Sequence, residues 1–336
     1  MWWWAEVSAH LRHSRGLWPR RRAPLPWRTF SLPQALRRKT AAVILLLTVV
    51  VSAYALKVTV NNKIPIEGFA CARKLTKDDE VTTDELDGMP WTQGVTRVAA
   101  LTGAGISTDS GIPDFRGPAG LWTKDPAAEK MSTYQFYVSD PAVRQRSWQA
   151  RLVHPAWAAK PNAAHLALAQ LANSPIDTHV ITQNIDGLHQ KAGAPADRVM
   201  ELHGTIYGVV CVGCGARTEM AETLVRVRAG ESDPPCADCG GILKSATVMF
   251  GQALDVAVLS RAATSAQNAD LFLAIGSTLT VEPAASLCAV AVKGGAKLVV
   301  INRDPTPYDG LAVATIRQPI SEAVPAIVSR LLSPTA

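Results

Sequence analysis

The chain has 336 residues, of which 48% are hydrophobic and 18% are charged, so a sizeable core is expected and global disorder is excluded. Its formal charge of +6 is confined to the N-terminus, because residues 1–40 carry nine Arg and Lys and one acid, whereas residues 89–336 carry 20 bases and 20 acids. The body has no basic excess that could track a phosphate backbone, and we expect no direct nucleic acid partner.

Residues 1–88 differ in composition from the rest of the chain and form an N-terminal extension. Five of the nine Trp residues lie in the first 27 positions among Arg and Pro, and an apolar run follows over residues 41–56. Three interpretations compete: a membrane anchor, a cleaved signal peptide, and upstream DNA translated from a start codon placed too early. We favour the third, because Met89 begins a stretch that leads into a folded pattern. The expected location is then cytoplasmic, with membrane contact only if residues 41–56 are a real anchor.

A glycine-rich turn follows the first predicted strand of the body, residues 95–101. The turn contains Gly103, Ala104, Gly105 and Ile106 and leads into a helix-like stretch. This is how a Rossmann-type sheet meets a pyrophosphate, because glycines let the backbone approach and helix N–H groups face the anion. The third glycine of the G-x-G-x-x-G pattern is absent, so an ordinary turn between strand and helix is the alternative.

A second turn-rich segment places an acid, an aromatic residue and a base in a row, at Asp114, Phe115 and Arg116. Its glycines and proline exclude a continuous helix. We interpret it as a loop that covers a ligand. A solvated charged loop is the alternative.

Three later predicted strands, residues 178–182, 271–275 and 297–301, end in small or polar residues. In open α/β sheets the ligand lies at the carboxyl ends of the strands, so these residues are expected to line one crevice. Helical stretches over residues 163–171 and 257–266 alternate with the strands. The pattern predicts an α/β fold with a Rossmann-like, doubly wound parallel sheet. The residues that follow the strands are Gln183, Asn184, Ile185 and Asp186, then Gly276, Ser277 and Thr278, then Asn302, Arg303 and Asp304.

Four cysteines give the strongest local signal. Cys211 and Cys214 form one C-x2-C pair, Cys236 and Cys239 form another, and 21 residues separate the pairs. Two such pairs can close a tetrahedron around Zn²⁺, with two disulfides or a redox pair as the alternatives. All four ligands would be thiolates with no open position for water, so one structural zinc ion per chain is predicted, in a ribbon over about residues 209–242.

Among the histidines, His203 is the candidate general base. It lies on a predicted loop next to Gly204, shortly before the zinc ribbon, and a neutral imidazole near pH 7 suits proton abstraction. His165 and His179 lie in core-like patterns and His154 lies beside a proline, and all three are expected to be structural.

Six motifs in this order resemble the sirtuin family, in particular its bacterial type. They are GAGISTDSGIPDFRG (103–117), TQNIDGLH (182–189), LHG (202–204), the two C-x2-C pairs, and GSTLTVEPA (276–284). The resemblance implies an NAD-dependent protein-lysine deacylase, most simply a deacetylase, that acts on acylated lysine side chains and releases nicotinamide and O-acyl-ADP-ribose. It also implies that residues 89–336 are one catalytic domain, with the zinc ribbon and a helical module (about residues 119–160) inserted in a Rossmann domain.

The resemblance also implies a role for each motif residue. Gly103 to Ile106 would hold the pyrophosphate of NAD, and Asp114, Phe115 and Arg116 would cover the cofactor. Gln183 to Asp186 would bind the nicotinamide and its ribose, with Asn184, Asp186 and His203 as the catalytic set. The residues after the third and fourth strands, 276–278 and 302–304, would bind phosphates and adenosine. Val248, Phe250, Gly251 and Val281 would bind the acyl-lysine, with the peptide added as a strand.

Two departures from the family pattern and two alternative activities remain open. Gln252 stands where the family usually has Glu, and Ser277-Thr278 where it usually has Thr-Ser. Trp148 and Arg151 partly match the Tyr-x-x-Arg pair of members that prefer acidic acyl groups, which would make the enzyme a desuccinylase, but an Arg on a solvated helix face is the interpretation we favour. Protein mono-ADP-ribosyl transfer would use the same NAD site, and an NAD-sensing module without turnover is the non-enzymatic alternative.

Overall fold

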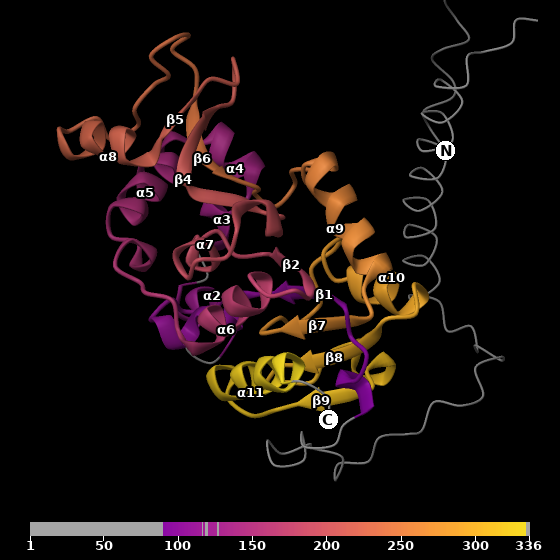
Figure 1. Ribbon diagram of the computed structural model, residues 1–336. Coiled ribbons are helices and arrows are strands. Elements are labelled where there is room, and N and C mark those ends of the chain that lie inside the picture. Colours follow the sequence, from indigo (N-terminus) through magenta and orange to yellow (C-terminus); the bar gives the residue numbers. More distant parts are fainter. Residues whose placement is uncertain (1–89, 116, 118–119, 126–127, 334–336) are drawn as a thin grey trace, which may run out of the picture. The chain divides into compact units, whose positions relative to one another are not determined.

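The central sheet has six parallel strands in the order β3-β2-β1-β7-β8-β9. The computed structural model describes residues 90–333 apart from 116, 118–119 and 126–127, and these residues belong to one compact unit (Figure 1). The apolar run over residues 41–56 and the Arg116 side chain lie outside the described residues. The strands are β1 (Arg97–Thr102), β2 (Asp177–Thr182), β3 (Val199–Glu201), β7 (Leu271–Ile275), β8 (Lys297–Ile301) and β9 (Ala314–Ile316).

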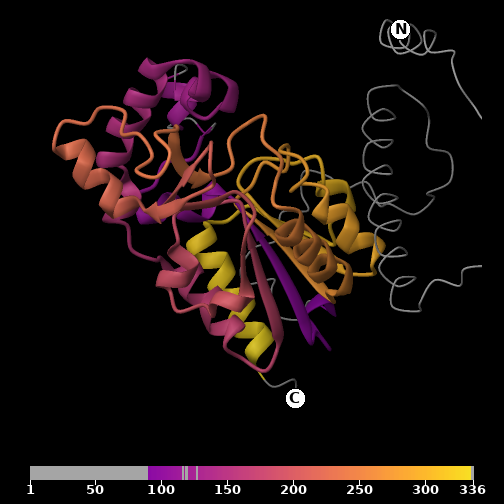
Figure 2. The same cartoon turned by 90° about the horizontal axis from the view of Figure 1, so that it is seen from above.

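Helices cover both faces of this sheet, which confirms the predicted doubly wound arrangement. Alternate residues of each strand point to opposite faces, so Leu271 and Leu273 of β7 join one buried cluster with α6 and α11, whereas Phe272 joins a second with α9 and α10. Figure 2 shows α11 (yellow) and α9 (orange) on opposite sides of the strands. The four helices are α6 (Ala163–Ala172), α9 (Val256–Asn268), α10 (Leu287–Lys293) and α11 (Ile320–Leu332).

Two insertions between the strands of the sheet share a core of their own. Four α-helices lie among the described residues between β1 and α6, and an antiparallel sheet of order β5-β4-β6 lies between β3 and β7. Trp148 of α5 is 1% exposed and packs in one cluster with Met220, Leu224 and Leu243 from the second insertion. The elements are α2 (Leu121–Lys124), α3 (Ala128–Met131), α4 (Tyr134–Ser139), α5 (Pro141–Leu152), β4 (Gly204–Cys211), β5 (Arg217–Glu219), α8 (Met220–Arg228) and β6 (Leu243–Thr247).

Short helices make up the remaining helical elements of the described residues, and one of them follows the glycine turn. The helix-like stretch expected after the glycine turn is the 3₁₀ helix η3 (Ala104–Ser110), followed by an irregular loop. Gly111 ends η3 in the left-handed conformation, with φ of 83°. None of the helices among the described residues has the length and apolar composition needed to cross a membrane. The others are α7 (Leu188–Lys191), η2 (Pro90–Thr92), η4 (Pro155–Trp157), η5 (Ala196–Arg198) and η6 (Asp309–Leu311).

The order in which strands are added to the sheet reverses between β1 and β7, which predicts where a ligand would bind. From β1 the sheet grows through β2 and β3 on one side, and from β7 it grows through β8 and β9 on the other. In a doubly wound sheet the connections after such a pair of strands leave in opposite directions and open a crevice at their carboxyl ends. The polar residues after β1, β2, β7 and β8 all lie at this edge of the sheet.

Asp270 joins the amino ends of β7 and β1, at the end of the sheet opposite the predicted site. We expect its loss to destabilise the fold. Its carboxylate accepts hydrogen bonds from Thr96 and from Arg97, whose Nη2 lies 2.6 Å away, and these bonds hold the Asp270 pKa well below its usual range. Asp270→Asn should lower the free energy of unfolding by about 1–2 kcal/mol at pH 7, as measured by urea denaturation.

The effect of Asp270→Asn should also depend on pH. Because the folded-state pKa is depressed, the stabilisation is present above the unfolded pKa, about 4, and is lost as the pH falls below it. Glu322→Gln, at an exposed acid of α11, serves as the control and should change stability little. An equal difference between wild type and Asp270→Asn at pH 3 and pH 7 would contradict this interpretation.

Candidate functional site

The turns after β1 and β7 are in direct backbone contact through three glycines. Gly105 N donates to Gly276 O at 2.9 Å, and a Cβ added to Gly103 would lie 2.6 Å from that same oxygen. Gly276 has φ of 62°, and a Cβ there would lie 2.5 Å from Ile106 N. The sequence explained Gly103 and Gly105 by close approach to a pyrophosphate. The structure shows that a side chain at either position is already excluded by the neighbouring turn.

Side chains from β2 and β7 also meet at this crevice. Gln183 Nε2 donates to Ser277 Oγ at 3.0 Å, which joins the residues after the two strands. Asn184 Nδ2 donates to Gly103 O at 3.0 Å and to Ser107 Oγ at 3.1 Å. The structure therefore brings together predicted site residues from three strand ends, as the topology requires.

Asp186 is the most deeply buried acid of the site, with 5% of its surface exposed. Its Oδ2 accepts from Ser107 Oγ at 2.8 Å, and its Oδ1 accepts from Leu188 N at 3.0 Å. Ser107 thus bonds both Asn184 and Asp186. Ser107 was not predicted to be a site residue, although a hydroxyl residue directly after the glycine turn was the available signal. Ile185, between the two polar residues, is half-buried and its carbonyl accepts from Ile206 N.

His203 is half-buried and lies between β3 and β4 in the chain. Its ring is oriented by the backbone carbonyl of Gln183, the residue directly after β2. Nδ1 lies 2.9 Å from Gln183 O, and since a carbonyl can only accept, Nδ1 carries the proton. Burial lowers the pKa of His203 below its ordinary value, and the hydrogen bond to Gln183 partly opposes this shift. The ring is therefore neutral near pH 7 with its lone pair on Nε2, the form that a general base requires.

The segment after β6 is joined to both His203 and the first insertion. Val248 N donates to His203 O at 2.8 Å, and Phe250 exchanges backbone hydrogen bonds with Ser132 and Tyr134 in a parallel bridge. Phe250 is 42% exposed and Gly251 has φ of 89°. Gln252 Oε1 accepts from Met249 N at 3.1 Å, so an amide at this position still supports the turn. Val281, in the loop after β7, is half-buried.

The residues predicted to cover the cofactor and to bind adenosine are more exposed. Phe115 is 42% exposed, and Asp114 binds Gly117 N at 2.9 Å. Arg303 pairs with Asp304 at 3.1 Å, and the nearby Asp304 and Asp114 carboxylates contribute to raising the Arg303 pKa. The loop around Asp114 therefore lies near the end of β8. Thr278 is exposed and shares a hydrogen bond with Thr280, and Asn302 Nδ2 donates to Asp304 O.

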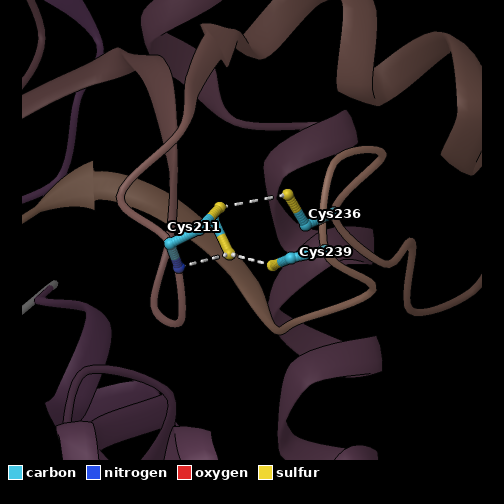
Figure 3. A group of neighbouring side chains, drawn as sticks. Cys211, Cys236 and Cys239 are labelled. Carbon is cyan, nitrogen blue, oxygen red and sulfur yellow. Dashed lines mark hydrogen bonds between the residues drawn. The ribbon is translucent and has the colours of Figure 1, made fainter.

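Four cysteine sulfurs lie within 4.8 Å of one another in the second insertion (Figure 3). The Sγ atoms of Cys211 and Cys239 are 3.5 Å apart and those of Cys214 and Cys236 are 3.7 Å apart. Tetrahedral zinc with Zn–S bonds near 2.3 Å places its sulfurs about 3.8 Å from one another. The backbone N–H of Cys214, followed by that of Gly213, lowers the pKa of Cys211 to about 6, which favours the thiolate that binds metal. The four residues fit the predicted structural zinc, and Cys288 is buried in the core as expected.

Arg151 lies differently from the expectation. The favoured interpretation placed it on a solvated helix face, but α5 packs on β6, and Arg151 Nη2 donates to Ser245 Oγ at 3.3 Å. Arg151 Nε is buried with no partner among the described residues. Lys244 is only 4% exposed, and burial together with the nearby Arg151 lowers its pKa to about 8. Lys244 was not predicted to be buried, because a lysine at the start of a strand normally indicates a solvent-facing position.

The sheet, the polar residues gathered at its switch point and the four-cysteine cluster define a doubly wound α/β protein whose cysteines fit a structural zinc ion. The model of the Sir2 family matches residues 103–283. The NAD-dependent protein deacetylase 2 of Streptomyces coelicolor is 57% identical over 234 residues, which are 70% of this chain and 97% of that protein. The chain belongs to the Sir2 family, the sirtuins, as its motifs indicated.

Solved structures of the family share this fold. A Sir2 variant with a deacetylated p53 peptide and 3′-O-acetyl-ADP-ribose is 35% identical, with a TM-score of 0.65 over 71% of this chain and 95% of that chain. A Sir2 complex with a p53 peptide and NAD is 34% identical, with a TM-score of 0.64 over 73% of this chain and 96% of that chain.

Proposed function

We propose that this protein is an NAD-dependent protein-lysine deacetylase. The observation that carries the proposal is His203, a neutral base whose proton is held on Nδ1 by Gln183 O, at the edge of the sheet where Asn184 and Asp186 lie. Membership of the Sir2 family and the 57% identical relative named as a deacetylase support it.

The crevice has the features expected of an NAD site. The backbone turns at Gly103–Ile106 and Gly276–Thr278 would hold the phosphates, where no side chain obstructs the approach. Gln183, Asn184 and Asp186 would bind the nicotinamide and its ribose, and Asn302, Arg303 and Asp304 the adenosine end. Bound NAD supplies an anomeric carbon that accepts the acyl oxygen as nicotinamide leaves.

The residues of this chain then orient, shield and move one proton. Phe115, on the loop with Asp114 and Arg116, would exclude water from the reacting ribose, since water would divert the reaction to hydrolysis. His203 Nε2 would take a proton from a ribose hydroxyl, because Nδ1 is already protonated and fixed. Asp186, buried beside Ser107, would orient Asn184 and the loop that holds the ribose.

The acyl-lysine peptide would bind as an added strand along residues 248–251 on one side and near Val281 on the other. The backbone of Val248 is fixed by His203 O and that of Phe250 by the bridge to residues 132–134. The exposed ring of Phe250 would contact the lysine stem. A peptide held by main-chain bonds would be recognised with little dependence on its own side chains.

One observation favours a second acyl class, with a terminal carboxylate. Arg151 Nη2 donates to Ser245 Oγ, and the buried Lys244 Nζ donates to Ser245 O and Thr247 O, but neither cation has an acidic partner among the described residues. These partners are neutral, so an anion placed beside the two cations would be stabilised by them. A succinyl group is the acyl chain of that chemistry, which makes desuccinylase activity the second candidate.

We also propose that residues 89–336 are the catalytic domain and that it works in the cytoplasm. Four cysteines that must stay reduced to bind zinc favour a reducing compartment. The relative from Streptomyces coelicolor aligns over 97% of its own length with only 70% of this chain, which supports an extension outside the catalytic domain.

Peptide mass measurement tests the proposed activity. The purified full chain is incubated with NAD and either an acetylated or a succinylated peptide. We expect NAD-dependent loss of acetyl, unchanged in Arg151→Met. Preferential loss of succinyl, abolished in Arg151→Met, would instead establish the acidic acyl class. If both peptides keep their mass while label from NAD stays on a protein, the activity is ADP-ribosyl transfer and the deacetylase proposal is wrong.

A further inference from the structure

His189 is a buried histidine that the chemistry above does not use. It lies in α7, directly after the loop that carries Asn184 and Asp186, and it is 1% exposed. Its Nε2 lies 3.0 Å from Thr102 Oγ1, and Thr102 Oγ1 donates to Thr182 Oγ1 at 2.9 Å. Thr182 Oγ1 accepts the backbone N–H of Asn184 at 3.0 Å. Three consecutive hydrogen bonds therefore connect His189 to Asn184.

The position of each proton in this chain of hydrogen bonds follows from the partners. Thr102 has one hydroxyl proton and gives it to Thr182, so its oxygen can only accept from His189. Burial, together with the His165 ring at 5.0 Å, lowers the pKa of His189 to about 3, so the imidazole is neutral and has one N–H. That N–H is on Nε2 and points to Thr102.

The other ring nitrogen shows that packing alone does not explain a histidine at this position. Nδ1 of His189 is buried and has no hydrogen-bond partner among the described residues. A buried acceptor without a partner is unfavourable, and an apolar ring of similar size would avoid that penalty. What an apolar ring could not supply is the N–H that Thr102 accepts.

We propose that His189 is a positioning residue for the NAD site, acting through Thr102 and Thr182 on the backbone of Asn184. The other end of Asn184 is held independently, because its Nδ2 donates to Gly103 O and to Ser107 Oγ. With backbone and carboxamide both fixed, Asn184 presents one orientation to the nicotinamide ribose. The inference rests on the proposed function, since it takes Asn184 as an NAD-binding residue.

Substitution of His189 in the full chain tests this role. His189→Phe should lower kcat for deacetylation by about 10- to 100-fold and weaken the Kd for NAD about tenfold, with the KM for acetylated peptide unchanged. His189→Gln should stay within about threefold of wild type, because its carboxamide N–H can replace Nε2–H as the donor to Thr102. Equal losses in the Phe and Gln variants would overturn the proposal.

A double-mutant cycle separates positioning from packing. Thr102→Val removes the link, so His189→Phe added to Thr102→Val should change kcat and the NAD Kd by less than about twofold further. If the double variant instead lost activity by the product of the two single-variant factors, His189 would not act through Thr102. Leu168→Ala, in the buried core of α6, is the stability control, and at a matched Tm it should retain kcat. A comparable loss of kcat in Leu168→Ala would assign the effect to stability.

The two readouts keep this proposal distinct from the proposed function. If the wild type binds NAD but does not remove acetyl, the deacetylase function fails, whereas the NAD Kd of the variants still decides the role of His189. If the wild type turns over and His189→Phe behaves like it in both kcat and Kd, only the positioning role is wrong.

Discussion

Replacing His203 with alanine is expected to lower kcat/KM for deacetylation by about 10²- to 10⁴-fold, the range for loss of a general base. The reason is geometric, because Gln183 O fixes the proton on Nδ1 and leaves Nε2 as the only base that this ring can offer. The NAD Kd should change less than about threefold, because the residues assigned to the phosphates and to adenosine are untouched. Steady-state kinetics and calorimetry measure the two quantities.

The pH dependence of kcat/KM gives a second test of the role of His203, with another histidine as the control. Burial lowers the His203 pKa, so the base form persists below pH 6.5, and the acid limb of kcat/KM should lie below that value. His179→Ala, in β2 next to Arg198, removes a histidine outside the crevice and should leave the profile unchanged. A His203→Ala enzyme with wild-type kcat/KM would show that another group takes the proton.

Removal of the zinc ion should give the largest loss of stability. Cys236→Ser should reduce the zinc content from one ion per chain to less than about 0.2 and lower the free energy of unfolding by more than about 3 kcal/mol. Cys236 is buried with its sulfur 3.7 Å from that of Cys214, so a hydroxyl cannot replace it as a soft ligand. Metal analysis and thermal unfolding, with and without a chelator, provide the measurements.

Cys288→Ala is the matched control, because Cys288 is also buried but lies in α10, away from the four-cysteine cluster. It should keep a full complement of zinc. A Cys236→Ser protein with one zinc ion per chain and an unchanged Tm would show that the four cysteines do not form a structural metal site.

Strands that are continuous apolar runs were the most predictable part of the fold. Residues 271–275 and 297–301 are β7 and β8 to the residue, because buried parallel strands need apolar side chains on both faces. The edge strands β3 and β9 were not predicted. Each has only three residues, and a three-residue segment has too little periodicity to distinguish it from a loop.

The residues of the candidate site could be predicted from the sequence, but the contacts between them could not. Gln183 and Asn184 stood out because polar residues follow a buried strand. The contact of Gly103 and Gly105 with Gly276 could not be predicted, because it joins residues more than 170 positions apart. Arg151 was misplaced for a related reason: its helix face is covered by β6, and a local pattern cannot show which distant element covers a helix.

The core shared by the two insertions has a consequence for how such proteins can be recombined. Trp148 comes from the insertion between β1 and α6, and Met220, Leu224 and Leu243 come from the one between β3 and β7, yet they pack in one cluster with Cys211 and Cys236. A chimaera that exchanges only one insertion with a distant relative would oppose two unmatched surfaces. The two insertions therefore form one packing unit, and a graft intended to change acyl preference must transfer both segments together.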